Sequence, residues 1–180
     1  MKEVDLLLAI SPIDGRYHGI TEEINEYFSE YAFIKYRVII EFDWLSFLIK
    51  KINKEEVSFK KIIDNFHIND VRRIKEIEEK TNHDVKAIEY YVREKLKENN
   101  LEKYTNFVHF GCTSEDINNI AYGKMIKDFM NNTLNNDMWR LIYTVKMEAI
   151  KLSNLPMLGH THGQHATPTT VRKRTCSICI

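Results

Sequence analysis

The chain has 180 residues, of which 43% are apolar and 29% charged, and its 26 basic side chains balance its 26 acidic ones. Zero net charge provides no overall positive field that would attract nucleic acid or a membrane surface, and no apolar run approaches the ~20 residues of a membrane-spanning helix. Glycine (6) and proline (3) are scarce, which favours an all-α fold because strand-rich folds need such residues at their turns.

The start of the sequence and the cysteine count suggest a cytoplasmic protein. Two acids lie within residues 1–5, and no signal-peptide pattern follows them. The three cysteines are an odd number, so we expect reduced thiols rather than a disulfide framework.

A long amphipathic helix is predicted from residue 21 to about residue 52. A continuous helix of this length would be ~45 Å long, at ~1.5 Å per residue, and would indicate an elongated bundle. Apolar residues recur there at three- and four-residue spacings, namely Ile24, Tyr27, Phe28, Tyr31, Ile34, Val38, Leu45, Leu48 and Ile52.

Shorter helices are predicted in the next part of the chain. Residues 58–66 could form one, and Asn69 or Asp70 can cap another that has apolar residues at helical spacing. Residues 81–83 interrupt that helix. Helical spacing then resumes over residues 85–96, which predicts a further helix.

Two more helices and a loop are predicted beyond residue 110. Hydroxyls and acids that begin at Thr113 can satisfy the free N–H groups of a helix N-terminus, and this helix extends to about Phe129. The polar residues 131–133 weaken it. A last helix is expected at about 137–153, and residues 155–170, which contain two of the three prolines, are expected to form a loop.

Residues 160–165 contain three of the seven histidines. Imidazoles ligate zinc, but the usual helical pair has an acid beside it and this segment has no carboxylate. A histidine that acts as a general acid or base is one alternative, because its unperturbed pKa of about 6.5 lets it exchange protons near neutral pH. Surface histidines without a function are the other.

Three further segments could carry chemistry. Residues 82–84 place a histidine beside an acid at an expected helix start, although Asp84 alone could simply cap that helix. The hydroxyls of residues 113–114 could cap their helix or help to bind an anion. Arg16 lies beside Tyr17 in an expected turn, and its planar fork suits phosphate, although a surface arginine needs no function.

Four motifs follow one another along the chain, and together they resemble one enzyme family. They read SPIDGRY at residues 11–17, TNHDVKA at 81–87, CTSEDINN at 112–119 and THGQHATP at 161–168. Their sequences and order resemble those of the adenylosuccinate lyases of the aspartase/fumarase superfamily, and the resemblance extends over about residues 9–170. Fumarases and argininosuccinate lyases share the architecture but differ at these motifs, which favours the adenylosuccinate lyase branch.

The resemblance implies a carbon–nitrogen lyase of purine nucleotide biosynthesis that works by β-elimination. Adenylosuccinate gives AMP and fumarate, and the succinylated aminoimidazole carboxamide ribotide gives its carboxamide and fumarate. This chemistry needs a base, groups that stabilise a dianion, and an acid for the leaving nitrogen. The family implies no cofactor, no metal, small-molecule substrates rather than nucleic acid or a membrane, and a homotetramer whose active sites combine several subunits.

Individual residues take their expected roles from the matched motifs. His162 matches the general acid that protonates the leaving nitrogen, and His83 matches a group that orients the substrate and supports the acid. Positions that match substrate contacts are Arg16, Tyr17, Asn82, His83, Asp84, Thr113, Ser114 and Gln164, with Arg16 suited to the nucleotide's phosphate.

The chain departs from the family pattern in two places. The family's general base is a serine on a loop that ends in a Met-Pro-x-Lys-x-Asn-Pro type of motif, and these 180 residues contain no such motif. Residues 171–180 lack the apolar helix face that the family has there, and the spacing of Cys176 and Cys179 is weak evidence for a redox or metal pair. We expect a truncated or frame-shifted reading of a longer gene.

The expected domain organisation follows from the same resemblance. Residues 1–110 form an N-terminal helical domain, residues 111–170 begin the central helical bundle and contain the general-acid loop, and residues 171–180 form a non-family tail. A rival interpretation is a non-catalytic helical protein that binds nucleotide or other subunits, since long amphipathic helices without a complete site are typical of such a module.

Overall fold

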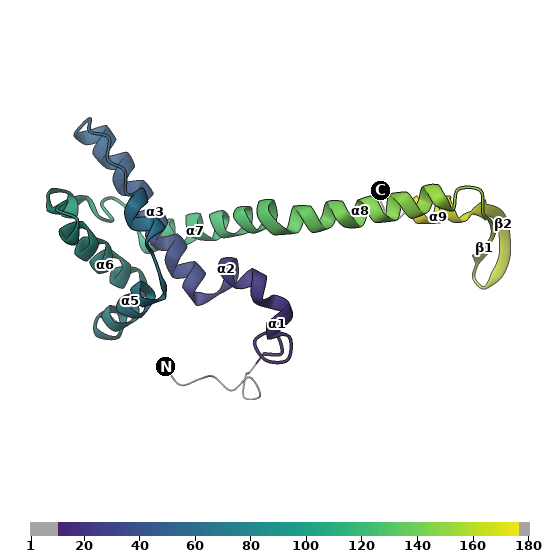
Figure 1. The fold of residues 1–180 in the computed structure, drawn as a ribbon, viewed down its shortest axis with the longest axis horizontal. Helices are drawn as coiled ribbons and strands as arrows, with labels where there is room; N and C mark the ends of the chain where they lie inside the picture. The colour runs from purple at the N-terminus through teal and green to yellow at the C-terminus, as the bar shows by residue number, and fades with distance from the viewer. Residues whose placement is uncertain (1–10, 177–180) are drawn as a thin grey trace. The chain divides into compact units, whose positions relative to one another are not determined.

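A computed structural model of the protein describes residues 11–176. The chain divides into two compact units, the first ending at Asp128 and the second beginning at Phe129. Helices dominate both units (Figure 1), and the only sheet in the described part of the chain is a two-stranded hairpin. This confirms the predicted all-α class.

The long helix predicted from residue 21 is interrupted at Ser29. Three short elements precede the main helix: α1 (His18–Thr21), the 3-10 turn η2 (Glu22–Ile24) and α2 (Asn25–Phe28), followed by α3 (Glu30–Ile52). Ser29 has an extended backbone, with φ −79° and ψ 164°, and its hydroxyl accepts a hydrogen bond from the N–H of Ala32 at 3.1 Å. Because this N-cap starts a new helix, the prediction of one continuous helix from residue 21 is wrong in its first part.

The other predicted helices of the first unit are confirmed, and a 3-10 turn, η3, lies among them. Asp70 caps α5 from within its first turn, where it accepts the backbone N–H of His67 at 2.8 Å. The elements are α4 (Lys60–Asp64), α5 (Ile68–Thr81), α6 (Asp84–Glu98), η3 (Glu102–Phe107) and α7 (Ser114–Phe129).

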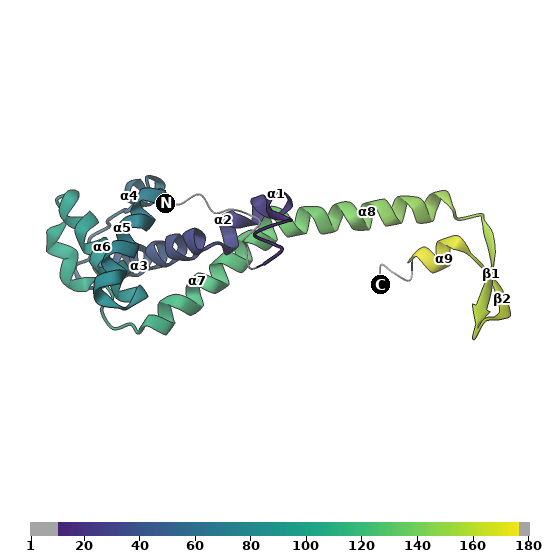
Figure 2. The same ribbon diagram turned by 90° about the horizontal axis from the view of Figure 1, so that it is seen from below.

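The core of the first unit holds α5 and α6 against α3 (Figure 2). Each fully buried aliphatic or aromatic side chain contributes about 1.5–3 kcal/mol relative to an exposed one. A second, smaller cluster joins α3 to α7 through Ala32, Tyr36, Ile40, Ile117, Ala121 and Met125. Fully buried members of the main cluster include Phe42, Leu45, Ile49, Ile74, Ile88, Tyr91 and Leu96.

The second unit contains a π-helical turn, a helix, a hairpin and a short final helix. Its elements are η4 (Met130–Leu134), α8 (Asn135–Lys151), β1 (Pro156–Thr161), β2 (Gln164–Thr170) and α9 (Val171–Cys176). The weakening predicted for the polar residues 131–133 coincides with the π-helical turn. Because α9 covers residues 171–176, part of the expected non-family tail is helical. The expected pair of Cys176 and Cys179 lies outside the side chains that the structure describes.

The loop predicted for residues 155–170 is wrong, because strands β1 and β2 pair antiparallel there. The two prolines concealed this hairpin, since proline usually argues against a strand. Pro156 is the first residue of β1. Pro168 lies in β2 and pairs with Leu158 of β1. Both strands of a two-stranded sheet are edge strands, so each proline can sit where no ladder hydrogen bond is lost.

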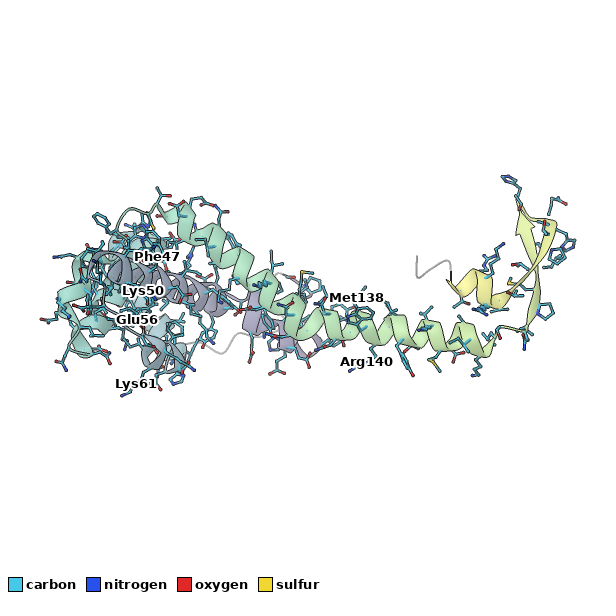
Figure 3. All side chains as sticks on the ribbon, turned by 90° about the horizontal axis from the view of Figure 1, so that it is seen from above. Phe47, Lys50, Glu56, Lys61, Met138 and Arg140 are labelled. Carbon is cyan, nitrogen blue, oxygen red and sulfur yellow. The ribbon has the colours of Figure 1, made fainter. Side chains whose placement is uncertain are left out.

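Helix α8 presents an apolar surface within its own unit. Trp139 is 69% exposed and Tyr143 63% exposed, and Met138 and Arg140 are labelled on this helix in Figure 3. None of the described helices is long and apolar enough to cross a membrane. The other exposed apolar side chains of α8 are Met138, Leu141, Ile142, Met147 and Ile150.

Candidate active site

The corner between α5 and α6 displays the first group of predicted site residues. Asn82 adopts the left-handed conformation, with φ 48° and ψ 32°, and its N–H donates to the carbonyl of Glu78 at the end of α5. Asparagine is one of the few side chains that tolerate this conformation. His83 then serves as the N-cap of α6, because its Nδ1 accepts the backbone N–H of Lys86 at 3.2 Å. The sequence therefore turns sharply and presents both side chains at the corner.

The capping bond determines which nitrogen of His83 can face a ligand. Because Nδ1 accepts a hydrogen bond, the proton of the neutral ring resides on Nε2. The side chain is 51% exposed, so Nε2–H is available as a donor. An open hollow of about 580 Å³ lies at this corner and is lined by Lys75, Glu78, Glu79, Asn82, His83 and Asp84.

Asp84 is engaged in holding the fold. Its Oδ2 accepts a hydrogen bond from Arg37 Nη2 at 2.7 Å. Burial raises the pKa of Asp84, but the Val85 N–H and the Arg37 guanidinium together lower it below its ordinary value. Asp84 therefore remains ionised, and its oxygen nearest Arg37 is unavailable to a substrate.

The start of α7 separates the roles of two neighbouring hydroxyls. The backbone N–H and the hydroxyl of Thr113 both donate to Asp116 Oδ2, at 2.8 and 3.1 Å. These two bonds lower the pKa of Asp116. Thr113 thus takes part in capping α7, which is one of the two alternatives that the sequence analysis left open. The Ser114 hydroxyl makes no hydrogen bond to another residue of the described part of the chain, so it can contact a ligand at this positively polarised helix end.

A buried ion pair lies directly before the α7 motif. His109 Nδ1 is 2.6 Å from Glu41 Oε1, and the Glu41 side chain is fully buried. Glu89 lies 3.9 Å from His109 Nε2 and is itself paired with Lys86. The hydrogen bond to Glu41 raises the pKa of His109 above its ordinary 6.5, and the Glu41 and Glu89 charges add to it, while burial and Lys86 oppose it.

This pair predicts that the first unit loses stability as the pH rises. A histidine whose pKa is raised by folding contributes its full stabilisation below its unfolded pKa, about 6.5, and loses it as the pH climbs through its folded pKa. The free energy of unfolding should therefore fall above about pH 6.5 more steeply than in a His109→Asn variant. Asparagine suits the positive φ of 60° at this position.

Tryptophan fluorescence can measure this effect in the first unit alone. Trp44 Nε1 donates to the carbonyl of Phe110 at 2.9 Å, and the chain has only one other tryptophan, Trp139. Urea unfolding is followed in a Trp139→Phe background at several pH values. A His67→Asn variant serves as the control, since His67 is the N-cap of α5 and has no ion pair with the residues that the structure describes. Equal pH slopes for the His109→Asn variant and its parent would contradict the prediction.

The turn at residues 11–17 exposes the predicted arginine. The Tyr17 N–H donates to the Pro12 carbonyl at 2.9 Å, and the Arg16 guanidinium lies 5.5 Å from the centroid of the Tyr17 ring. Among residues 11–176, no carboxylate is paired with Arg16. In the described part of the chain, no hydrogen bond or ion pair joins this turn to residues 82–84 or 113–114.

The hairpin of the second unit places His162 at its tip. Thr161 pairs with Gln164, so His162 and Gly163 form the loop, and both have positive φ, 54° and 77°. Positive φ at both central residues is the requirement of a type I′ turn, which favours asparagine or glycine. A histidine there costs about 1–3 kcal/mol, and such strain points to function. His160 and His165 flank the turn with their ring centroids 5.0 Å apart.

Sequence patterns had not marked Arg37 and Glu41 as important. Arg37 follows Ile34 by three residues and precedes Val38, so it lies on the buried face of α3, and Glu41 follows it by one turn. A charged residue within an apolar stripe is the signal that could have revealed both. No group of three or more His, Cys, Asp or Glu side chains in the described range could hold a metal ion.

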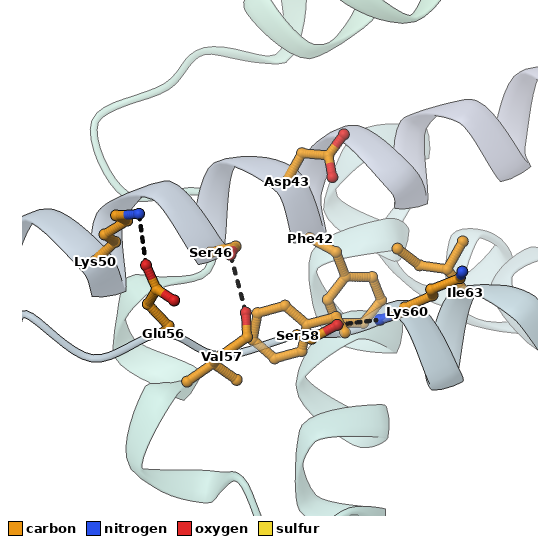
Figure 4. Close-up of a pocket in the computed structure, with 10 residues that line it drawn as sticks. Phe42, Asp43, Ser46, Lys50, Glu56, Val57, Ser58, Lys60 and Ile63 are labelled. Atoms are coloured by element: carbon orange, nitrogen blue, oxygen red, sulfur yellow. Dashed lines mark hydrogen bonds and ion pairs between the residues drawn. The ribbon is translucent and has the colours of Figure 1, made fainter.

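A larger hollow of the first unit contains none of the motif residues (Figure 4). Its volume is about 670 Å³, and it lies between α3, residues 56–59 and α4. Lys50 and Glu56 are paired there at 2.7 Å, and the Ser46 hydroxyl donates to the Val57 carbonyl at 3.0 Å. These polar groups are already hydrogen-bonded to one another. We therefore place the candidate site of the first unit at residues 82–84 and 113–114 instead.

Comparison with known proteins agrees with the motifs. Adenylosuccinate lyase of Buchnera aphidicola subsp. Acyrthosiphon pisum is 44% identical over 181 residues, which cover 95% of this chain and 40% of that protein. The Dictyostelium discoideum adenylosuccinate lyase is 42% identical over 185 residues, with the same coverage of 95% and 40%. The chain thus spans about 40% of the length of these curated relatives, and the resemblance to the N-terminal portion of adenylosuccinate lyases is confirmed.

Solved structures share the fold at lower identity. The β-carboxy-cis,cis-muconate cycloisomerase of Acinetobacter calcoaceticus superposes with a TM-score of 0.60 at 20% identity, over 87% of this chain and 37% of that one. A fumarate lyase from Mesorhizobium has the same TM-score and identity, over 87% and 36%. A family model described as lyase matches residues 15–178. The chain therefore belongs to the lyase family.

Proposed function

We propose that this chain forms the N-terminal part of a carbon–nitrogen lyase that eliminates fumarate from adenylosuccinate, giving AMP, and from the succinylated aminoimidazole carboxamide ribotide. The main support is the 44% identity to a curated adenylosuccinate lyase over 95% of the chain. The muconate cycloisomerase and the other distant structures support the fold alone.

The proposed reaction assigns each residue one task. A base removes the proton from the carbon next to a substrate carboxylate, the electron pair forms the carbon–carbon double bond of fumarate, and the carbon–nitrogen bond breaks. His162 donates a proton to the leaving nitrogen. His83 orients the substrate through Nε2–H, and Ser114 contacts it at the start of α7. No residue of this chain is assigned as the base.

Further substrate contacts and the setting of the enzyme complete the proposal. We assign further contacts with the substrate to Tyr17, Asn82, Thr113 and Gln164. Asp84 contributes mainly by holding α6 to α3 through its ion pair with Arg37. We place the reaction in purine nucleotide biosynthesis in the cytoplasm, in a homotetramer. The exposed apolar side chains of α8 support association, since large exposed apolar patches mark interaction surfaces.

The experiment that tests this function uses a chimeric lyase. It joins residues 1–170 of this chain to the remaining residues of the Buchnera relative, and fumarate release from adenylosuccinate is followed by absorbance. We expect turnover, and the Buchnera enzyme by itself is the positive control. A well-folded chimeric lyase that releases no fumarate would overturn the assignment.

The rival function is a non-catalytic helical protein that binds nucleotide or other subunits. The exposed face of α8 is the observation that favours it, because such a surface suits a binding module as well as an enzyme subunit. The two functions differ in the chimeric lyase, where AMP binding without fumarate release would support the rival.

Arg16 should bind the phosphate of the nucleotide. Arg16→Ala should weaken AMP binding to the chimeric lyase by about 10- to 100-fold, because hydrogen bonds to charged groups contribute about 1.5–3 kcal/mol. Arg16→Lys should also weaken it, since lysine keeps the charge but lacks the planar fork.

Calorimetric titration with AMP measures both variants of Arg16. Arg72→Ala is the matched control, because Arg72 is an exposed arginine outside the motifs, and its side chain donates only to Asn69 among the described residues. Unchanged affinity in both Arg16 variants would remove Arg16 from the phosphate site.

A further inference from the structure

Arg37 is a buried guanidinium that connects three helices of the first unit. Its side chain is only 7% exposed. Nε donates to Asn118 Oδ1 on α7 at 2.8 Å, and Nη2 donates to Asp84 Oδ2 on α6 at 2.7 Å. The guanidinium carbon lies 3.7 Å from the centroid of the Phe33 ring on α3. One side chain thus contacts the helix that carries it and two others.

The two partners of Arg37 lie beside the two candidate site segments. Asp84 directly follows His83, whose Nε2–H is available to a ligand. Asn118 lies one helical turn after Ser114, and its own Nδ2 donates to Glu115 Oε2 at 3.3 Å. A displacement of either partner would therefore move the neighbouring site residue with it.

The hydrophobic core does not by itself align these two segments. Helix α6 packs in the main cluster with α3 and α5, whereas α7 meets α3 through the separate cluster around Ile117 and Ala121. Apolar contacts are non-directional, so each cluster can set a distance to α3 without setting how the start of α6 faces the start of α7. The Arg37 guanidinium joins those two starts by directional hydrogen bonds.

Arginine is suited to this task for a chemical reason. Its planar fork presents donors in a fixed geometry and can hold two acceptors at once, whereas a lysine ammonium is a point charge on a flexible stem. Burying such a charge is costly unless it is paired and hydrogen-bonded. The ionised Asp84 provides this pairing, and its own side chain is half-exposed.

We propose that Arg37 is a positioning residue of the lyase site: it fixes the start of α6, with His83, relative to the start of α7, with Ser114. This role rests on the proposed function, because it assigns substrate contacts to both segments. Arg37 itself touches no substrate in this proposal.

The first arm of the test measures geometry in the 180-residue chain. Nitroxide labels are attached at Tyr90→Cys on α6 and Ile120→Cys on α7, two exposed positions, after the native cysteines are replaced by serine. With labelled chains diluted in an excess of unlabelled chains, so that only distances within one chain are measured, pulsed electron paramagnetic resonance should give one narrow distance distribution with Arg37 present. Arg37→Gln should shift or broaden it. Asn118→Ala should do the same, although it retains the ion pair between Arg37 and Asp84 and so protects the fold.

Arg73 provides a matched control. It also joins two helices, since it pairs with Glu76 on its own helix α5 and with Glu94 on α6. Among the described residues, none of its hydrogen bonds or ion pairs reaches α7, so Arg73→Gln should leave the distance distribution unchanged.

The second arm measures activity in the chimeric lyase. Arg37→Gln should lower kcat/KM by about 10²-fold, because a misplacement of about 1 Å can cost that much. Arg37→Lys should recover only part of the loss. The rates are measured well below each variant's unfolding temperature, so that a merely structural effect would lower that temperature and leave kcat/KM near the parent value.

The outcomes separate this role from the proposed function. Unchanged label distances in Arg37→Gln and Asn118→Ala would overturn the positioning role, as would a kcat/KM that falls only with the unfolded fraction. A chimeric lyase that is inactive even with Arg37 in place would contradict the proposed function, and the label distances would still support or overturn the positioning role.

Discussion

Replacing His162 by asparagine in the chimeric lyase should lower turnover by about 10²–10⁴-fold, the usual contribution of a positioned acid or base, while AMP affinity changes little. The hairpin geometry makes asparagine the informative substitution. His162 has a φ of 54° in a turn of the I′ kind, and asparagine tolerates that conformation better than alanine does. The turn should therefore persist, so that the loss reports the missing proton donor.

The measurement compares initial rates of fumarate release with AMP titrations of the same protein. His162→Ala should be at least as inactive, because it removes the donor and also disfavours the turn. His160→Asn is the control, since His160 lies in β1 outside the Thr-His-Gly-Gln motif. Near-normal turnover in His162→Asn would show that another group protonates the leaving nitrogen.

Residues 1–180 by themselves should release no fumarate from adenylosuccinate. They contain the candidate acid and candidate binding groups, but no residue matches the base serine of the family. Catalytic groups that act as a unit lose most of their effect when one of them is missing. The exposed apolar side chains of α8 should also make this chain self-associate.

The assay for this prediction uses the pure chain at high concentration beside the chimeric lyase, and sedimentation velocity records the state of association. Turnover within about tenfold of the chimeric lyase would refute the argument from the missing base. In that case, a residue within this chain would have to remove the proton.

Local sequence patterns were sufficient for most of the helices. Helices α5, α6 and α7 were predicted with nearly their observed limits, because helical spacing and end caps involve residues only three or four positions apart. The type of turn at the hairpin tip could not be anticipated, since two prolines argued against the strands that create it. The break before α3 was also missed, although Ser29 is a local signal for a helix start.

The sequence by itself determined the helical class, the family resemblance and the positions of the motif residues. Only the tertiary structure revealed the buried charges: Arg37 meets acceptors 47 and 81 residues away, and His109 meets Glu41 across 68 residues. A charge on an apolar helix face is tolerated only when distant partners satisfy it. Those partners are brought together by packing between helices, which no local pattern encodes.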